Sequence, residues 1–253
     1  MSEIGKAMRM KGILGEDGRA LIVALDHGLG APFVRGLEDP LKVIDEIAKG
    51  GADAIIAPLG MARTIYAELP RRVGAILSIP TDPNSVRTAV GLGYHAVKNT
   101  FFGALKDERL GIIHSLALEC ELQGMPLLAE IVPADPRTGE LTYDLSQVKA
   151  AGRFAAEFGA DMVKTSYTGS PDTFREVVQA CPIPIVILGG ARMDDDESVL
   201  QNVKGAIDAG AAGVAFGRNI FQHQDPAAMT RAIAGIVHND TNVEEALKEL
   251  PWP

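Results

Sequence analysis

Eight short apolar runs, separated by segments of helical spacing, constrain this chain more than any other feature. The runs begin at Ala20, Ala52, Arg72, Tyr94, Met125, Ala160, Ile183 and Ala211. They are almost continuously apolar, as parallel strands covered on both faces must be. The segments between them, such as 40–51 and 146–160, repeat apolar residues at helical spacing and usually close on a glycine. The pattern therefore predicts eight strands, each followed by a helix.

A single (β/α)8 TIM barrel, an α/β fold, is the simplest architecture for this order. The length of 253 residues is typical of such a barrel, and no linker-like stretch divides the chain. We expect one domain over 1–253, with a short N-terminal lead-in at 1–18 and an extra C-terminal helix at about 241–250. A doubly wound sheet is the alternative, but the first strand leads into DHGLGAPF rather than a dinucleotide-binding glycine loop.

Charge and composition exclude several classes of partner. The net charge of -9 argues against a nucleic-acid partner, although it leaves room for a local basic pocket that binds a phosphate ester. No apolar run reaches the length of a membrane span or a signal peptide, so we expect no membrane partner and a cytoplasmic location. Cys120 and Cys181 are isolated, which predicts neither a disulfide nor a metal site.

Polar side chains stand at the ends of most of the predicted strands. In (β/α)8 barrels the chemistry collects at the C-terminal ends of the strands and in the loops that follow them. Strands that are otherwise so apolar would not carry charged groups without a use for them. The residues that we single out at these ends are Asp26, His27, Lys98, Glu130, Lys164 and Ser166.

The ends of the last two strands indicate a phosphate site. The loops after strands 7 and 8 bind phosphate in many barrels, through backbone amides and a helix N-terminus. Gly189 and Gly190 would let the backbone approach an anion closely, and Gly217 is followed by Arg218, whose fork suits phosphate oxygens. The alternative is that the glycines only turn the chain and that the arginine pairs with a surface carboxylate.

Lys164 is the residue on which the functional prediction depends. It alternates in phase with Met162 and Ser166, so the three share one face of a strand. If that face is the barrel interior, burial favours the neutral amine, which attacks carbonyls to form an imine and then an enamine. The alternative is a structural salt bridge to Asp26 or Glu130 across the barrel.

Imine chemistry also needs a proton shuttle, and the strand ends offer candidates. Asp26 is the best candidate to move protons near a carbinolamine or to hold a substrate hydroxyl. His27 is either functional or a packing residue, and it would point to the opposite strand face unless the strand has ended. Lys98 is a second interior amine, which could instead contact a substrate phosphate or point outward.

Four motifs resemble the archaeal-type class I aldolase family. They are LDHG at 25–28, VKTSYTG at 163–169, GG at 189–190 and DAGAAGVAFGRNIFQHQDP at 208–226. That family holds fructose-bisphosphate aldolases of this type, 2-amino-3,7-dideoxy-D-threo-hept-6-ulosonate synthases, and the thiolase that acts on the phosphorylated autoinducer-2 breakdown product. The resemblance extends from about the first strand to the eighth helix, and it is strongest after residue 146.

The resemblance implies a (β/α)8 barrel, often in a multimeric ring, and hence a homo-oligomer. It implies a Schiff-base lysine at Lys164 and a role for Asp26 at the carbon chain of the substrate. It places a substrate phosphate at Gly189, Gly190, Gly217 and Arg218. The expected activity is a class I aldolase, independent of metals and cofactors, that cleaves or forms a C–C bond in a phosphorylated ketose. The expected donor is dihydroxyacetone phosphate or a related phosphorylated carbonyl compound.

One departure from the family affects the proton shuttle. The family's aldolases carry a tyrosine in a Tyr-Pro-Arg-Gly run after the fifth strand, where it donates and accepts the proton. Here the region reads AEIVPADPRTGE, so Asp135 precedes the Pro136-Arg137 pair. Tyr143 lies eight positions beyond Asp135 and is not assigned this role. We expect Glu130 or Asp135 to carry the proton instead. The substrate can then be a compound other than fructose 1,6-bisphosphate. Lys98, Asp135 and Ser166 are further candidates for substrate contacts.

Three other functions stay open. A thiolase or transaldolase-like synthase of the same family would reveal itself by coenzyme A dependence or by its choice of acceptor. A metal-dependent aldolase or isomerase, with His27, His95 and carboxylates as ligands, has no supporting spacing, and insensitivity of the activity to a chelator would exclude it. A non-catalytic phosphosugar-binding protein would bind phosphate esters without ever forming an imine.

Overall fold

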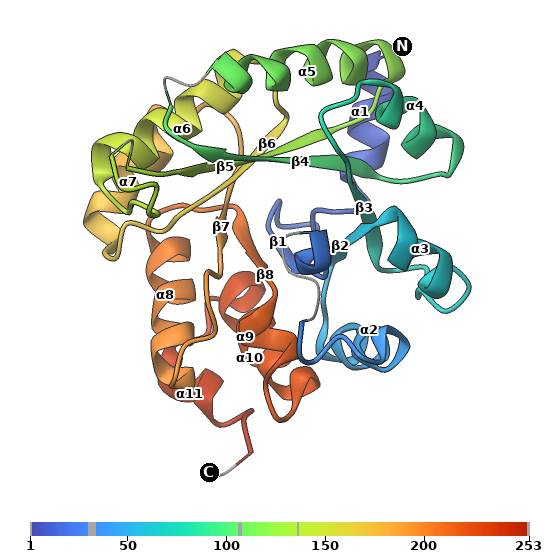
Figure 1. Cartoon of the computed structure of the whole chain (residues 1–253). Helices are drawn as coiled ribbons and strands as arrows, with labels where there is room; N and C mark the ends of the chain where they lie inside the picture. The colour runs from blue at the N-terminus through green and yellow to red at the C-terminus, as the bar shows by residue number, and fades with distance from the viewer. Residues whose placement is uncertain (1, 30–33, 106–107, 136, 252–253) are drawn as a thin grey trace.

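The computed structural model describes residues 2–29, 34–105, 108–135 and 137–251, in which eight parallel strands close into one barrel (Figure 1). Neighbours along the chain are neighbours around the barrel, and β8 closes it by pairing with β1. The strands are β1 (Ala20–Ala24), β2 (Ala54–Pro58), β3 (Gly74–Ser78), β4 (Ala96–Gly103), β5 (Leu127–Pro133), β6 (Met162–Thr165), β7 (Ile185–Leu188) and β8 (Gly213–Phe216). The (β/α)8 barrel predicted from the apolar runs is confirmed.

Helices surround the barrel on its outer side (Figure 1). They are α1 (Ser2–Met10), α2 (Pro40–Gly50), α3 (Leu59–Ile65), α4 (Asn84–Gly91), α5 (Ile112–Gln123), α6 (Leu145–Glu157), α7 (Pro171–Ala180), α8 (Asp196–Asp208), α9 (Arg218–Phe221), α10 (Pro226–Asn239) and α11 (Val243–Leu247), with 3-10 turns η1 (His27–Leu29) and η2 (Glu108–Gly111). The extra C-terminal helix predicted at about 241–250 is α11. Among the described helices, none is long and apolar enough to cross a membrane.

Alternate residues of each strand divide between two apolar layers. In β1, Ile22 packs in the inner layer, whereas Leu21 and Val23 pack in the outer layer against the helices. Apart from Met162, the inner layer is composed of small and branched side chains. Its members are Ile13, Ala20, Ile22, Ala24, Ala54, Ile56, Ile76, Ala96, Leu128, Met162, Val186 and Ala215. The barrel interior is therefore a packed core, and polar chemistry is confined to the end where this layer stops.

The stretch 1–18, for which the sequence predicts only a lead-in, contains the helix α1. Lys6 Nζ of α1 lies 2.8 Å from Glu121 Oε2 of α5 and 2.9 Å from Asp161 Oδ1, just before β6. Ile13 follows the helix and fills the inner layer at the N-terminal end of the barrel. α1 contains no fully buried residue, and it is held by the charged contacts of Lys6 and by Met10, which packs against the inner layer.

Candidate active site

Four charged side chains gather in the barrel interior above the inner apolar layer. Asp26 follows β1, whereas Lys98, Glu130 and Lys164 belong to β4, β5 and β6. Each lies two positions beyond a residue of the inner layer, namely Ala24, Ala96, Leu128 and Met162. Because side chains alternate along a strand, the period of two carries all four into the interior. Their exposed fractions are between 3% and 8%. The fold therefore brings together in the interior four of the residues predicted from the strand ends.

The four side chains form one chain of ion pairs. Lys164 Nζ lies 2.6 Å from Glu130 Oε1. The other carboxylate oxygen, Glu130 Oε2, lies 2.6 Å from Lys98 Nζ. Lys98 Nζ also donates to Asp26 Oδ2 at 2.7 Å. Two ammonium groups and two carboxylates therefore alternate across the barrel, and each buried charge has an opposite charge beside it.

The two lysines hold Asp26 and Glu130 ionised, and the two carboxylates hold Lys98 ionised. Burial acts to raise the pKa of Asp26, but Lys98 and then Lys164 outweigh it, and the pKa is lowered. Burial likewise opposes ionisation of Glu130, yet the charges of Lys164 and Lys98 lower its pKa strongly. Burial acts to lower the pKa of Lys98, but Glu130 and Asp26 raise it. At neutral pH both carboxyl groups are therefore ionised and Lys98 is an ammonium.

The salt bridge of Lys164 with Glu130 is one of the structural alternatives that the sequence leaves open, and it is present. It does not compete with imine chemistry. A carboxylate 2.6 Å from an ammonium can accept its proton as a carbonyl compound approaches, and this leaves a neutral amine that can attack. The same contact therefore stabilises the resting site and provides a proton acceptor at the nitrogen.

Thr100 is a member of this network that the sequence analysis does not single out. Its Oγ1 accepts a hydrogen bond from Lys98 Nζ at 2.5 Å and donates one to Glu130 Oε2 at 2.8 Å. It lies two residues beyond Lys98 on the same face of β4, which is the signal that could have identified it. The hydroxyl fixes the position of the ammonium between the two carboxylates.

His27 stands at the rim rather than on the opposite face of a strand. β1 ends at Ala24, and His27 begins the turn η1. Its ring lies edge-on to Phe221, with centroids 5.4 Å apart, and its Nδ1 is buried without a hydrogen-bond partner in the described part of the chain. Burial is the main cause that lowers the pKa of His27, so the imidazole is neutral at pH 7. A Cβ at Gly217 would lie 2.2 Å from His27 Cε1, which explains the glycine there.

The loops after β7 and β8, here called the glycine loops (residues 189–193 and 217–219), are tied to each other. Arg218 Nη2 donates to the carbonyl of Gly190 at 2.7 Å. Asn219 Nδ2 donates to the carbonyl of Gly189 at 2.8 Å. Gly190 has a φ of +65°, a conformation that favours glycine, and Arg218 Nε is buried without a partner among the described residues. The four predicted phosphate residues are thus assembled side by side, with an arginine donor still unused.

Asp135 and Ser166 are not part of the ion-pair chain. The carboxylate of Asp135 accepts from the backbone N–H groups of Arg137 and Thr138, so its contacts lie within its own turn. These hydrogen bonds, from Arg137 first, lower the pKa of Asp135. Ser166 is fully buried, and its Oγ has no hydrogen-bond partner in the described ranges. Pro136, which precedes Arg137, lies outside the described residues.

Tyr143 lies nearer to the site than its place in the sequence indicates. The chain after β5 folds back on itself through an antiparallel bridge between Ala134 and Leu141. As a result, Tyr143 Oη lies 4.0 Å from the position that a Cβ would take at Gly190. The side chain is half exposed and reaches over a glycine loop. Spacing along the chain from Asp135 could not reveal this proximity, because the fold-back produces it.

Comparison with known sequences identifies relatives along nearly the whole chain. The family model described as DeoC/LacD family aldolase matches residues 20–223. The 2-amino-3,7-dideoxy-D-threo-hept-6-ulosonate synthase of Halobacterium salinarum is 34% identical over 260 residues, which cover 98% of this chain and 97% of that protein. An uncharacterized aldolase of Saccharolobus solfataricus is 31% identical over 271 residues, covering 98% and 99% of the two chains.

Solved structures with the same architecture include archaeal enzymes. An archaeal fructose 1,6-bisphosphate aldolase superposes with a TM-score of 0.80 at 26% identity, covering 92% of this chain and 99% of the other. Another structure, also of an archaeal fructose-1,6-bisphosphate aldolase, has the catalytic lysine covalently bound to the carbinolamine intermediate of the substrate. It superposes with a TM-score of 0.79 at 27% identity, over 92% and 99% of the two chains.

Proposed function

The chain belongs to the DeoC/LacD family of aldolases and is a carbon–carbon lyase of the Schiff-base-forming class, and we propose that Lys164 is the residue that forms the imine. The observation that carries this assignment is the place of Lys164 at one end of the buried ion-pair chain, 2.6 Å from Glu130. We further propose that the substrate is a phosphorylated ketose, with dihydroxyacetone phosphate or a related phosphorylated carbonyl compound as the donor.

The first half of the reaction builds the imine. Lys164 loses its proton to Glu130, and the neutral nitrogen forms a bond to the carbonyl carbon, giving a carbinolamine. The carbinolamine hydroxyl takes a proton and leaves as water, and the C–O bond breaks as the C=N bond forms. Glu130 is the proton donor for this step, since its contact with the Lys164 nitrogen supports a transfer in either direction.

The second half breaks the C–C bond. Asp26 removes the proton from the hydroxyl that is β to the imine carbon, and an aldehyde leaves as the bonding electrons pass to the protonated imine. The product on Lys164 is an enamine, which takes a proton at carbon and is then hydrolysed by water to release the donor ketone. Lys98, between Asp26 and Glu130, lowers the pKa of Asp26, so Asp26 begins this step as a carboxylate, and its contacts align both side chains.

The proton at carbon needs a carrier in a chain without the family's tyrosine. Of the two carboxylates predicted from the sequence, Glu130 touches both lysines, whereas the contacts of Asp135 lie within its own turn. These contacts favour Glu130. The neutral imidazole of His27, with its unpartnered Nδ1, is a second carrier at the rim. The glycine loops, with Arg218, would hold the phosphate of the substrate and so orient its carbon chain toward Lys164.

A second candidate is a synthase of the same mechanism that transfers the donor to another carbonyl compound. Relatives named 2-amino-3,7-dideoxy-D-threo-hept-6-ulosonate synthase match 97–98% of the chain at 34% identity, and this favours transfer as much as simple cleavage. The two differ in one measurement. A lyase releases the donor ketone from a ketose phosphate alone, whereas a synthase turns over only when an acceptor is added. A homo-oligomer and a cytoplasmic location stay predictions.

Borohydride trapping tests the assignment of Lys164. The enzyme is incubated with dihydroxyacetone phosphate, reduced with borohydride, digested and analysed by peptide mass spectrometry. We expect the reduced adduct on the peptide with Lys164, and no adduct in Lys164→Met, while Lys98→Met still forms the adduct at a lower rate. An adduct on Lys98 in the wild-type protein would move the imine across the barrel. Turnover by Lys164→Met would exclude this lysine.

A further inference from the structure

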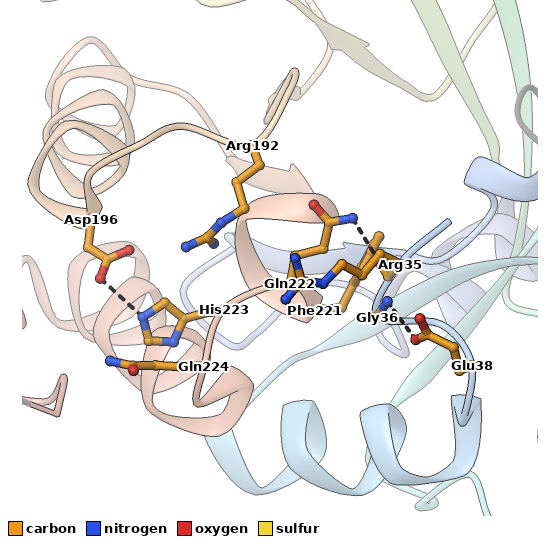
Figure 2. A pocket seen from close by; sticks show the side chains of 9 residues that line it. All are labelled: Arg35, Gly36, Glu38, Arg192, Asp196, Phe221, Gln222, His223 and Gln224. Carbon is orange, nitrogen blue, oxygen red and sulfur yellow. Dashed lines mark hydrogen bonds and ion pairs between the residues drawn. The ribbon is translucent and has the colours of Figure 1, made fainter. Parts of the chain in front are cut away.

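A cavity that does not include Lys164 among its lining residues opens next to the glycine loops. Its volume is about 530 Å³, within the range of small-molecule sites. It is lined by Arg35, Gly36 and Glu38 ahead of α2, by Arg192 and Asp196 between β7 and the start of α8, and by the end of α9 with the turn that follows it. Figure 2 shows the side chains that line it. Three segments at the rim of the barrel therefore meet around a space that Lys164 does not line.

Two arginines enter this cavity from different sides. Arg35 comes from the loop after β1 and Arg192 from the loop after β7, and their guanidinium groups point into the same space (Figure 2). Within the described ranges, neither guanidinium has an ion pair or a hydrogen bond. An arginine fork matches the geometry of a phosphoryl or carboxylate group. Two unpaired forks that converge on one space are suited to an anionic group.

The other polar groups of the cavity indicate more closely which class of ligand it binds. Glu38 Oε2 accepts from the backbone N–H of Gly36 at 2.6 Å, and Asp196 Oδ2 lies 3.1 Å from His223 Nε2. One oxygen of each carboxylate is thus engaged, and the other remains available. Two carboxylates would repel a bare anion, but they accept hydrogen bonds from hydroxyl groups. The lining therefore suits a ligand with an anionic end and a hydroxyl-bearing body.

The cavity shares a wall with the candidate active site. Phe221 lines the cavity, is only 3% exposed, and packs edge-on against the ring of His27. Gln222 Nε2 donates to the carbonyl of Arg35 at 2.8 Å, which fixes the loop after β1 against the turn after α9. A Cβ at Gly36 would lie 2.7 Å from the carbonyl oxygen of Phe221, so this approach requires a glycine. The walls are consequently held by specific contacts.

We propose that this cavity binds the phosphorylated end of a small polyhydroxy metabolite. Arg35 and Arg192 hold the phosphoryl group, and Glu38 and Asp196 accept hydrogen bonds from the hydroxyls. The phosphoryl group belongs either to a separate molecule or to the far end of an extended substrate. The inference does not depend on the imine, because neither the cavity nor its arginines involve Lys164.

Binding of glucitol 6-phosphate tests the proposal. This polyol phosphate has no carbonyl group, so it cannot form an imine and reports binding alone. Isothermal titration calorimetry would compare the wild-type enzyme with Arg35→Gln/Arg192→Gln, which changes the cavity, and with Arg218→Gln, which changes the glycine loops. Arg153→Gln/Arg175→Gln is the matched control, because it removes the same charge from the helices α6 and α7. Thermal unfolding of each variant checks that it is folded.

The expected result is that Arg35→Gln/Arg192→Gln weakens one binding event by about 10-fold or more, since charge-assisted hydrogen bonds are lost. The wild-type enzyme could bind two equivalents of glucitol 6-phosphate, one weakened by Arg35→Gln/Arg192→Gln and the other by Arg218→Gln. That result would identify the ligand of the cavity as a separate molecule. One equivalent that both changes weaken would identify the far end of the substrate. Affinity that is absent in the wild-type enzyme, that is unchanged in Arg35→Gln/Arg192→Gln, or that inorganic phosphate matches would overturn the proposal.

Discussion

Replacement of Lys98 by methionine is expected to destabilise the fold, and the structure sets the size of the effect. Lys98 Nζ lies 2.7 Å from Asp26 and 2.6 Å from Glu130, and its side chain is only 4% exposed. Methionine fills a similar volume without the charge, so Asp26 loses its ammonium partner while Glu130 keeps Lys164. Removal of one partner from a buried ion pair costs about 3–5 kcal/mol of the free energy of unfolding.

The loss of stability in Lys98→Met should depend on pH, and the direction of this dependence follows from the pKa shifts. In the wild-type protein the pKa of Asp26 is lowered, so its contribution to stability is present above its unfolded pKa and is lost as the pH falls through the folded value. Without Lys98, burial favours the protonated acid and raises the folded pKa, so the variant loses stability as the pH rises. The difference between the two proteins should be largest near pH 8 and smaller near pH 4.5.

Urea unfolding at pH 4.5 and pH 8 measures this difference. Lys149→Met is the matched control, because it removes a half-exposed lysine that pairs with Glu176 on the surface, and it should cost about 0–1 kcal/mol at both values. Lys98→Met/Asp26→Asn should recover part of the loss at pH 8, since the uncompensated carboxylate is then absent. If Lys98→Met loses the same free energy at both pH values, or is as stable as the wild-type protein at pH 8, the electrostatic reasoning is refuted.

Two further predictions concern groups outside the ion-pair chain. The hydrogen bond with Asp53 is the main cause that raises the pKa of His238 to about 9, so its contribution to stability is present below its unfolded pKa and is lost as the pH rises through about 9. Urea unfolding from pH 7 to 10 should show that the free energy of unfolding of the wild-type protein declines by about 1–2 kcal/mol, after allowance for solvent screening. His238→Gln should lack this decline, and an equal decline in both proteins would contradict the prediction. Tyr143→Phe should raise KM for a phosphorylated ketose by about 5-fold and leave kcat within about 2-fold, because Oη lies over Gly190. Steady-state kinetics measure this, and a fall in kcat alone would argue for a proton-transfer role instead.

The order of strands and the interior face of each could be predicted from local patterns. Lys164 follows Met162 by two residues, and Glu130 follows Leu128 by two, so the inward direction of the charged residues follows from the period of the strand. The eight apolar runs similarly predicted the barrel, although each run is longer than its strand. The prediction of a lead-in at 1–18 missed α1, a helix in which no residue is fully buried and which is held by the ion pairs of Lys6 and the packing of Met10.

Pairings between distant residues could not be predicted in the same way. The sequence allows Lys98 to be a second amine, a phosphate contact or an outward residue, and only the closed barrel shows it between Asp26 and Glu130. Tyr143 was set aside because of its distance along the chain from Asp135. The bridge between Ala134 and Leu141 reverses the chain and carries this tyrosine to a glycine loop.

Local patterns in the sequence were sufficient to predict the architecture and the residues that face the barrel interior, because each of these depends on neighbours within a few positions of the chain. Only the closed barrel shows which charges share a contact and which arginines have none among the described residues. Closure of the barrel brings β1, β4, β5 and β6 around one axis, so Asp26 and Lys164, separated by most of the chain, belong to one line of ion pairs. The same closure brings Arg35 and Arg192 to one cavity, for which no local pattern exists.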